Sequence, residues 1–188
     1  MTAPELQDNA ALIVIDVQRG YDDAEFWGAR NNPACEANVR RLIDAWTASG
    51  RPIVLVRHDS VSPDSPLDTG LPGNALKDVV ADIRYDLLVS KEVNSAFYGT
   101  PDLGAWLTRK KIEQIVLCGI QTNMCVETTA RMGGNLGFDV LVAIDACHTF
   151  DLEGSDGTAL KADQLTAATA VNLSGGEFAQ IVTTAQLV

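Results

Sequence analysis

The sequence predicts one α/β domain, spanning residues 1–188, in which helices cover both faces of a mostly parallel sheet. Short β-branched apolar runs alternate along the chain with segments whose apolar residues recur at helical spacing. This alternation is typical of βαβ units, in which a helix connects two parallel strands. A length of 188 residues, with 46% hydrophobic and 21% charged residues, suits one globular domain with a sizeable core.

Six apolar runs have the composition of buried strands, and four segments between them have helical periodicity. Pro33 lies in the first turn of the first helix, so Asn31 or Asn32 would cap that helix and Gly50 would end it. Thr100 is placed to cap the helix after the third strand. The predicted strands are residues 10–15, 52–56, 87–89, 112–119, 138–144 and 178–183, and the predicted helices are residues 33–49, 101–107, 123–136 and 162–173.

The composition argues against several kinds of partner. A formal charge of −11 disfavours binding to nucleic acid or anionic membranes, since both need clustered Lys and Arg. No signal-peptide pattern opens the chain, and no apolar run approaches the ~20 residues of a spanning helix. We therefore expect a cytoplasmic protein, although the charge says nothing about the reaction.

The numbers of cysteines and histidines limit the disulfides and metal sites that the chain could form. The four cysteines form no CxxC pair, so we expect reduced thiols; they are Cys35, Cys118, Cys125 and Cys147. The two histidines, His58 and His148, are too few for a zinc site built on several histidines. We expect neither a metal nor another cofactor.

Reactive residues gather at the carboxyl ends of the predicted strands, where parallel α/β sheets bind ligands. They are Asp16, His58, Lys91, Cys125 and His148. Cys125 lies where a strand passes into a helix, a position that lowers the pKa of a thiol and offers main-chain donors to an oxyanion. We interpret Cys125 as a nucleophile, Asp16 as its proton acceptor, and Lys91 as the cation that keeps both charged. Each also has an ordinary structural interpretation, as a buried apolar thiol, a turn cap or a solvated ammonium.

Four motifs resemble those of the isochorismatase-like cysteine hydrolases, the superfamily that includes nicotinamidases. The motifs are residues 12–18 (LIVIDVQ), 91–100 (KEVNSAFYGT), 119–126 (GIQTNMCV) and 145–148 (DACH). The resemblance implies a three-layer αβα, Rossmann-like fold with six parallel strands and a catalytic triad of Asp16, Lys91 and Cys125. It also implies a cis peptide bond between Ile120 and Gln121, and an oxyanion hole formed by the N–H groups of Gln121 and Cys125.

The same resemblance implies the remaining site residues and the assembly. Substrate-binding roles fall to Gln18, Tyr21, Phe97 and Thr122. Gln18 would orient the catalytic carboxylate, Thr122 would stabilise the turn at the nucleophile, and the two aromatic residues would line the pocket. The protein is expected to be a homo-oligomer, either a dimer or a tetramer. The outer walls would come from the loops at residues 19–32, 59–86 and 148–160, which include Phe26 and Trp27.

Two departures from the family pattern narrow the expected chemistry. Nicotinamidases hold a metal with an Asp and several histidines after the second strand, whereas this chain has Arg57-His58-Asp59-Ser60 there. Nicotinamide is therefore not the expected substrate, and a strand-capping role for His58 is preferred to substrate binding. True isochorismatases hydrolyse a vinyl ether and lack a cysteine at the position of Cys125. We therefore expect hydrolysis of an amide-type C–N bond through a thioester.

Several alternatives stay open at this point. The protein could be an isochorismatase-type vinyl ether hydrolase, or a catalytically idle binding or oligomer module on the same fold. Within a hydrolase, His148 could act as the base with Asp145 behind it, as in Cys-His-Asp enzymes. A redox-sensor role for Cys125 ranks low because no resolving cysteine lies near it in sequence.

Overall fold

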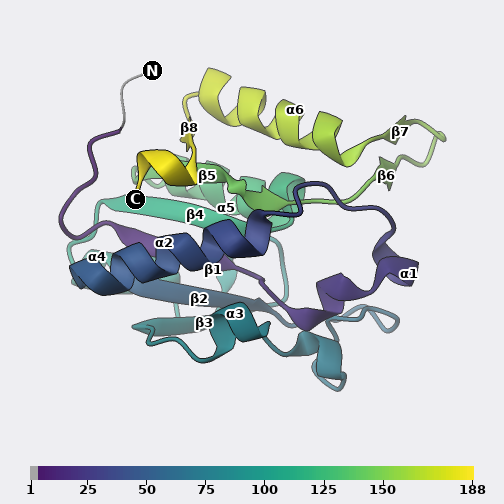
Figure 1. Ribbon diagram of the computed structural model, residues 1–188, viewed down its shortest axis with the longest axis horizontal. Helices are drawn as coiled ribbons and strands as arrows, with labels where there is room; N and C mark the ends of the chain where they lie inside the picture. Colours follow the sequence, from purple (N-terminus) through teal and green to yellow (C-terminus); the bar gives the residue numbers. More distant parts are fainter. Residues whose placement is uncertain (1–3) are drawn as a thin grey trace.

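A six-stranded parallel sheet in the order β3-β2-β1-β4-β5-β8 forms the centre of the protein. The computed structural model describes residues 4–188, and Figure 1 shows the sheet with helices around it. The predicted α/β class and all six predicted strands are confirmed. The strands are β1 (Ala11–Ile15), β2 (Ile53–His58), β3 (Leu87–Lys91), β4 (Gln114–Ile120), β5 (Asp139–His148) and β8 (Gln180–Val182).

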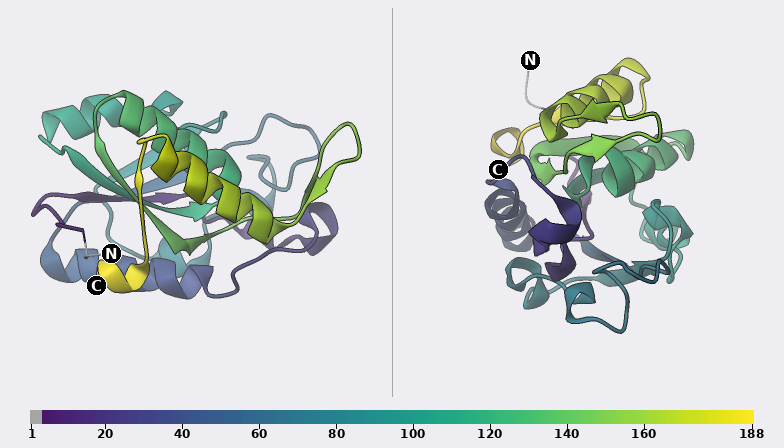
Figure 2. Two further views of the ribbon diagram at one scale, coloured as in Figure 1. Left: turned by 90° about the horizontal axis from the view of Figure 1, so that it is seen from above. Right: turned by 90° about the vertical axis from the view of Figure 1, so that its right-hand side faces the viewer.

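Helices cover both faces of the sheet, which makes three layers. Figure 2 shows α2 and α3 on one face and α4, α5 and α6 on the other. Because both faces are covered, the central strands β1 and β4 are buried along their whole length and read as continuous apolar runs. The helices are α1 (Ala24–Trp27), α2 (Cys35–Ser49), α3 (Asp78–Ala81), α4 (Leu103–Arg109), α5 (Glu127–Asn135) and α6 (Ala162–Gly175).

Several short elements lie where the sequence predicts only loops or the ends of helices. A two-stranded antiparallel hairpin, β6 (Leu152–Glu153) and β7 (Ala159–Leu160), extends from the edge of the domain within the loop predicted at residues 148–160. Its four residues are exposed, so hydrophobic periodicity gives no signal for it. The remaining elements are the 3₁₀ turns η1 (Arg19–Asp22), η2 (Pro72–Asn74), η3 (Ala96–Tyr98) and η5 (Thr184–Gln186), and the π-helical turn η4 (Thr122–Val126).

Two predicted helix caps are wrong. Helix α2 follows Ala34, and the side chain of Asn32 instead donates to the carbonyl oxygens of Asp145 and Cys147, which ties the loop to β5. Helix α4 is capped by Asp102, whose carboxylate accepts the N–H of Ala105 at 2.8 Å. Thr100 pairs through its main chain with Ser90, and this tertiary contact excludes it from the helix.

Gly119 lies where the neighbouring central strand leaves no room for a side chain. It pairs in register with Ile15 and has a φ of +121°, in the region that favours glycine. A Cβ atom at this position would overlap the carbonyl oxygen of Ile15. Position 119 therefore needs glycine for the strands that deliver Asp16 and Cys125 to lie side by side.

No helix within residues 4–188 combines the length and the apolar character that crossing a bilayer requires.

Candidate active site

The side chains of Asp16, Lys91 and Cys125 meet at the carboxyl ends of the central strands. Lys91 Nζ lies 2.6 Å from Asp16 Oδ2 and 3.3 Å from Cys125 Sγ. Asp16 follows the last residue of β1, Lys91 ends β3, and Cys125 lies in η4, which follows β4. The side chains of Asp16 and Lys91 are fully buried, so water does not screen their ion pair.

His58 is a fourth member of this group; the sequence places it at the same edge of the sheet, with a strand-capping role preferred to substrate binding. Its Nδ1 lies 3.2 Å from Lys91 Nζ. An ammonium group has three N–H donors, and here each faces a different acceptor on Asp16, His58 or Cys125. A sequence signal existed: His58 and Lys91 end neighbouring strands and pair in register.

The same three acceptors could in principle hold a metal ion, because their ligand atoms lie within 4.8 Å of one another. They are the carboxylate of Asp16, the imidazole of His58 and the thiol of Cys125. The ammonium of Lys91 already bonds to all three. The cation at the centre of this site is therefore a lysine side chain.

The electrostatics of the thiol differ from the sequence expectation. Burial, followed by the nearby Asp16 carboxylate, raises the pKa of Cys125 above its ordinary value, and Lys91 only partly opposes this. The prediction that the strand-to-helix turn lowers this pKa is wrong, because desolvation outweighs the turn. For Lys91, burial favours the neutral amine, but Asp16 and Cys125 outweigh it and raise the pKa. The resting site therefore holds a protonated thiol beside an ion pair.

Asp16 lies close to that thiol, with a carboxylate oxygen within 4.8 Å of Cys125 Sγ. Its φ is +52°, an uncommon value for a residue with a side chain and one seen at functional sites. Oδ2 is held by Lys91, whereas the buried Oδ1 has no hydrogen-bond partner among the described residues. A proton on Oδ1 would neutralise the carboxylate but leave the hydrogen bond from Lys91 to Oδ2 in place.

A cavity of about 320 Å³ opens onto Cys125. Tyr21, Phe26 and Trp27 form an aromatic side of this cavity, with the rings of Tyr21 and Trp27 5.0 Å apart. Gln121, at the start of the nucleophile turn, also lines it. The structure thus places the predicted aromatic wall and one predicted oxyanion residue beside the sulfur. The other lining residues are His58, Ser60, Ser62, Ser65, Leu67, Asn94 and Met124.

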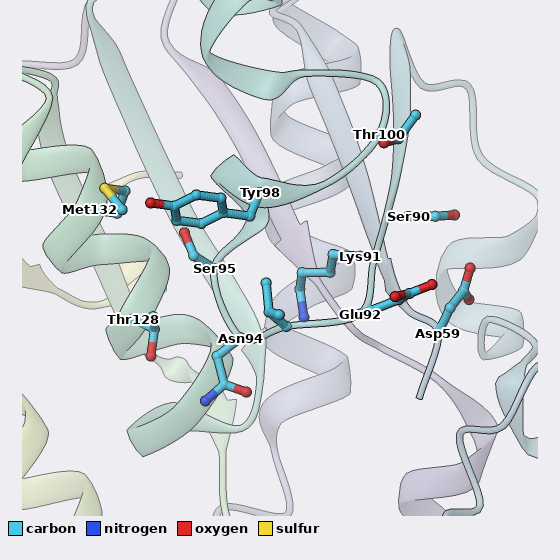
Figure 3. Close-up of a pocket in the computed structure, with 11 residues that line it drawn as sticks. Asp59, Ser90, Lys91, Glu92, Asn94, Ser95, Tyr98, Thr100, Thr128 and Met132 are labelled. Carbon is cyan, nitrogen blue, oxygen red and sulfur yellow. The ribbon is translucent and has the colours of Figure 1, made fainter. Parts of the chain in front are cut away.

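A second hollow, of about 820 Å³, lies on the other side of Asn94. Figure 3 shows Lys91 at the end of β3 and Asn94 on the segment that follows it, with Thr128 and Met132 of α5 across the hollow. Asn94 lines both spaces, and its Oδ1 lies 3.8 Å from Cys125 Sγ. Only the smaller cavity includes the sulfur among its lining atoms, so we take it as the reaction cavity.

Gln18 and Phe97 lie outside the reaction cavity, in contrast to their predicted roles. The Gln18 amide donates to the carbonyl oxygens of His58 and Asn74 and accepts the N–H of His58, so it holds the end of β2. Phe97 packs on the hydrophobic core against Phe138, with ring centroids 5.7 Å apart. The sequence motifs that contain Gln18 and Phe97 do not reveal these contacts, because the partner residues lie far away in the chain.

Thr122 and the cis bond lie at the turn that leads to Cys125. The Ile120–Gln121 peptide bond is cis, as the resemblance implies. Thr122 is the first residue of η4 and is fully buried, and its hydroxyl oxygen has no partner among the described residues. The turn itself is closed by main-chain bonds from Met124 and Val126 to the carbonyl oxygen of Gln121. The bond from Val126 spans five residues, the pattern of a π-turn, which is frequent at functional sites.

The alternative catalytic arrangement, with His148 as the base and Asp145 behind it, has no geometric support. Both ring nitrogens of His148 are buried without a hydrogen-bond partner among the described residues. Asp145 instead accepts the N–H and hydroxyl of Thr184, which holds η5 against the sheet. His148 packs edge-on against Phe150, with ring centroids 5.2 Å apart, so it belongs to the aromatic packing behind the cavity.

His148 gives a testable pH dependence of stability. Burial, followed by the nearby Arg30, lowers its pKa to about 3, whereas an unfolded histidine titrates near 6.5. Between these values the unfolded chain binds a proton that the folded chain does not, so stability falls as the pH decreases. Through His148, wild type should lose about 2 kcal/mol more than His148→Phe between pH 7.5 and pH 5, measured by urea unfolding. Equal losses in the two proteins would contradict this assignment.

Comparisons with known proteins agree with the geometry. The family model described as "Isochorismatase domain" matches residues 10–175. This chain belongs to the isochorismatase family. The uncharacterized isochorismatase family protein YrdC of Bacillus subtilis is 36% identical to it over 97% of this chain and 96% of its own length. Nicotinamidase 3 of Arabidopsis thaliana is 30% identical over 79% of this chain and 78% of its own length.

A solved structure gives the same result for the fold. An isochorismatase-family protein from Chromobacterium violaceum superposes with a TM-score of 0.91 and is 39% identical, covering 100% of this chain and 96% of its own. Membership of the isochorismatase family thus confirms the predicted resemblance, and hydrolase chemistry is the general activity of that family.

Proposed function

We propose that this isochorismatase-family protein is a cysteine hydrolase that cleaves an amide-type C–N bond of a small molecule. The observation that carries the proposal is the contact of one ammonium, that of Lys91, with both the Cys125 sulfur and the Asp16 carboxylate beside a small cavity. The relationship to a nicotinamidase supports amide chemistry at such a site.

The reaction follows from the positions of these atoms. As Cys125 Sγ forms a bond to the substrate carbonyl carbon, its proton passes to Oδ1 of Asp16. The N–H groups of Gln121 and Cys125 are assigned to the oxyanion of the tetrahedral intermediate. Asp16 returns the proton to the leaving nitrogen, the C–N bond breaks, and a thioester forms.

Hydrolysis of the thioester completes the cycle. Water attacks the thioester carbon while Asp16 takes one of its protons, and the C–S bond then breaks to release a carboxylic acid. The proton on Asp16 returns to the sulfur and restores the resting thiol. Lys91 stays charged throughout and balances the negative charge that moves between sulfur, carboxylate and oxyanion.

Nicotinamide itself is not the proposed substrate. In the segment after β2, both carboxylate oxygens of Asp59 are bonded to Arg57, at 2.7 and 2.9 Å, and Asn74 also donates to this carboxylate. Asp59 is therefore committed to an ion pair and an amide. Arg57 uses two of its nitrogens in the ion pair with Asp59, so it is not available to bind a substrate carboxylate.

A screen of small amides and ureides tests the proposal. Purified protein is expected to release ammonia or amine from at least one class, and hydroxylamine added during turnover is expected to yield the hydroxamate of the acyl group. The vinyl ether alternative needs no sulfur, so enol ether cleavage that survives loss of Cys125 would favour it. An absence of turnover across the whole screen would favour the idle-module alternative.

A further inference from the structure

We infer that the reaction cavity selects substrates that are uncharged around the scissile amide and rejects those that carry a carboxylate. This inference deepens the proposed function and shares with it the assignment of Cys125 as the reactive atom. It rests on the charges that line the cavity and on where each nearby cation is already bound.

The lining of the cavity supplies neutral donors but no free cation. Among the residues that the structure describes, no Lys or Arg lines the cavity that opens onto Cys125. The polar lining consists of hydroxyl, amide and imidazole groups, which bind neutral carbonyl or amide groups without adding charge. Its members are Tyr21, His58, Ser60, Ser62, Ser65, Asn94 and Gln121.

The two titratable groups of that lining, apart from the thiol, are neutral near pH 7. Burial, followed by the Lys91 ammonium, lowers the pKa of His58, so the ring does not become a cation there. Because Nδ1 faces the ammonium, the ring proton lies on Nε2, and a ring N–H is a neutral donor. Burial, followed by Cys125 and Asp16, raises the pKa of Tyr21 well above its ordinary value, so its hydroxyl keeps its proton.

The cations that surround the cavity are already paired. The three donors of Lys91 are committed to its three acceptors. Arg57 is bidentate to Asp59. Farther out, Lys77 bonds to Asp22 at 2.6 Å and to Glu36 at 2.8 Å, Arg30 is bidentate to Glu36, and Arg19 bonds to Asp78 at 2.6 Å.

A carboxylate in this cavity would thus lie near the buried Asp16 without a cation to balance its charge. Burial of an unpaired charge is strongly unfavourable, and the like charge of Asp16 adds to that cost. A neutral amide or alkyl group of the same size meets neither penalty. The aromatic side of the cavity would further favour a flat or apolar substituent.

Two alkylating reagents test the inference without knowledge of the substrate. Iodoacetamide and iodoacetate have nearly the same size and the same leaving group, but only the second carries a carboxylate. In each reaction the thiol sulfur forms a bond to carbon, iodide leaves, and the thiol proton goes to Asp16 or to buffer. Peptide mapping would separate labelling of Cys125 from labelling of the other three cysteines, which are at most 1% exposed.

The readout is the ratio of the two labelling rates at Cys125, divided by the same ratio for glutathione. This normalised preference for iodoacetamide is expected to be at least about tenfold, because the thiol is the same in both reactions and only the reagent's charge differs. A preference near one, faster labelling by iodoacetate, or no labelling of Cys125 by either reagent would overturn the inference.

A charge variant with a matched control sharpens the test. Ser62 lines the cavity and is exposed, so Ser62→Arg adds a cation at its mouth. Ser174 is equally exposed but lies on the last turns of α6, away from the cavity lining. Ser62→Arg should lower the preference at least about threefold, whereas Ser174→Arg, with the same net charge, should leave it within about twofold of wild type. An equal effect of both variants would overturn the inference.

These outcomes are distinct from failure of the proposed function. If no amide is hydrolysed but Cys125 still prefers iodoacetamide, the function fails and the charge selection stands. If amides are hydrolysed and the two reagents label equally, the function stands and the charge selection fails.

Discussion

Cys125→Ala is expected to lower turnover of any accepted amide by at least about 10⁴-fold, because no hydroxyl among the described residues of the cavity lining has a hydrogen bond to Lys91 that could replace the thiol. Cys125 is the cysteine that lines the cavity, and its sulfur contacts Lys91. The variant should remain folded, since alanine keeps the backbone of η4 and removes one sulfur atom. Ammonia release measures the activity, and urea unfolding with near-ultraviolet circular dichroism measures the fold.

Cys118→Ala is the matched control for this experiment. Cys118 is a fully buried residue of β4 that packs in the core and is not among the cavity lining. Its replacement should cost about 1–2 kcal/mol of stability through the small cavity it leaves, with activity within about twofold of wild type. Unchanged turnover in Cys125→Ala, with the Cys118 control also active, would remove the nucleophile assignment.

Lys91→Met is expected to remove activity and to destabilise the fold at the same time. The substitution keeps the length of the side chain but leaves the carboxylate of Asp16 buried without its ion-pair partner. Breaking a buried pair in this way costs about 3–5 kcal/mol, which urea unfolding at pH 7 would show. Turnover should fall at least about 10³-fold, because the cation that balances the moving negative charge is lost.

A double variant separates the two consequences of losing Lys91. Asp16→Asn combined with Lys91→Met buries no charge at this site, so most of the lost stability should return, while activity should stay absent.

His148→Phe, which tests the alternative base, should keep activity within about tenfold of wild type, since His148 has no hydrogen bond to the nucleophile. Activity retained in Lys91→Met but lost in His148→Phe would show that His148, and not Lys91, belongs to the catalytic group.

The parts of this protein that follow from local sequence patterns could be predicted from the sequence. Buried parallel strands leave a clear pattern, and their carboxyl ends must share one edge, so Asp16, Lys91 and Cys125 could be brought together before any coordinates. Family motifs then supplied the cis bond that the structure contains.

The parts that depend on contacts between distant segments could not be predicted. Gln18 lies in a motif, yet its amide bonds to the main chain of β2 and η2, which no local pattern encodes. The pKa of Cys125 follows from desolvation, and burial of a turn is not visible in the sequence around it. The sequence places His58 at the same sheet edge as Lys91, but the contact between their side chains depends on strand register, which only the structure shows.

The glycine at position 119 also limits how this enzyme can change by mutation. Strand β1, which leads to Asp16, and strand β4, which leads to Cys125, pair here with no room for a side chain at position 119. Any side chain at position 119 would push the two strands apart and so increase the distance between Asp16 and Cys125, even though that side chain would lie outside the reaction cavity. Loops around the cavity can vary and alter the substrate, while this contact beneath the site holds the spacing on which the proposed chemistry depends.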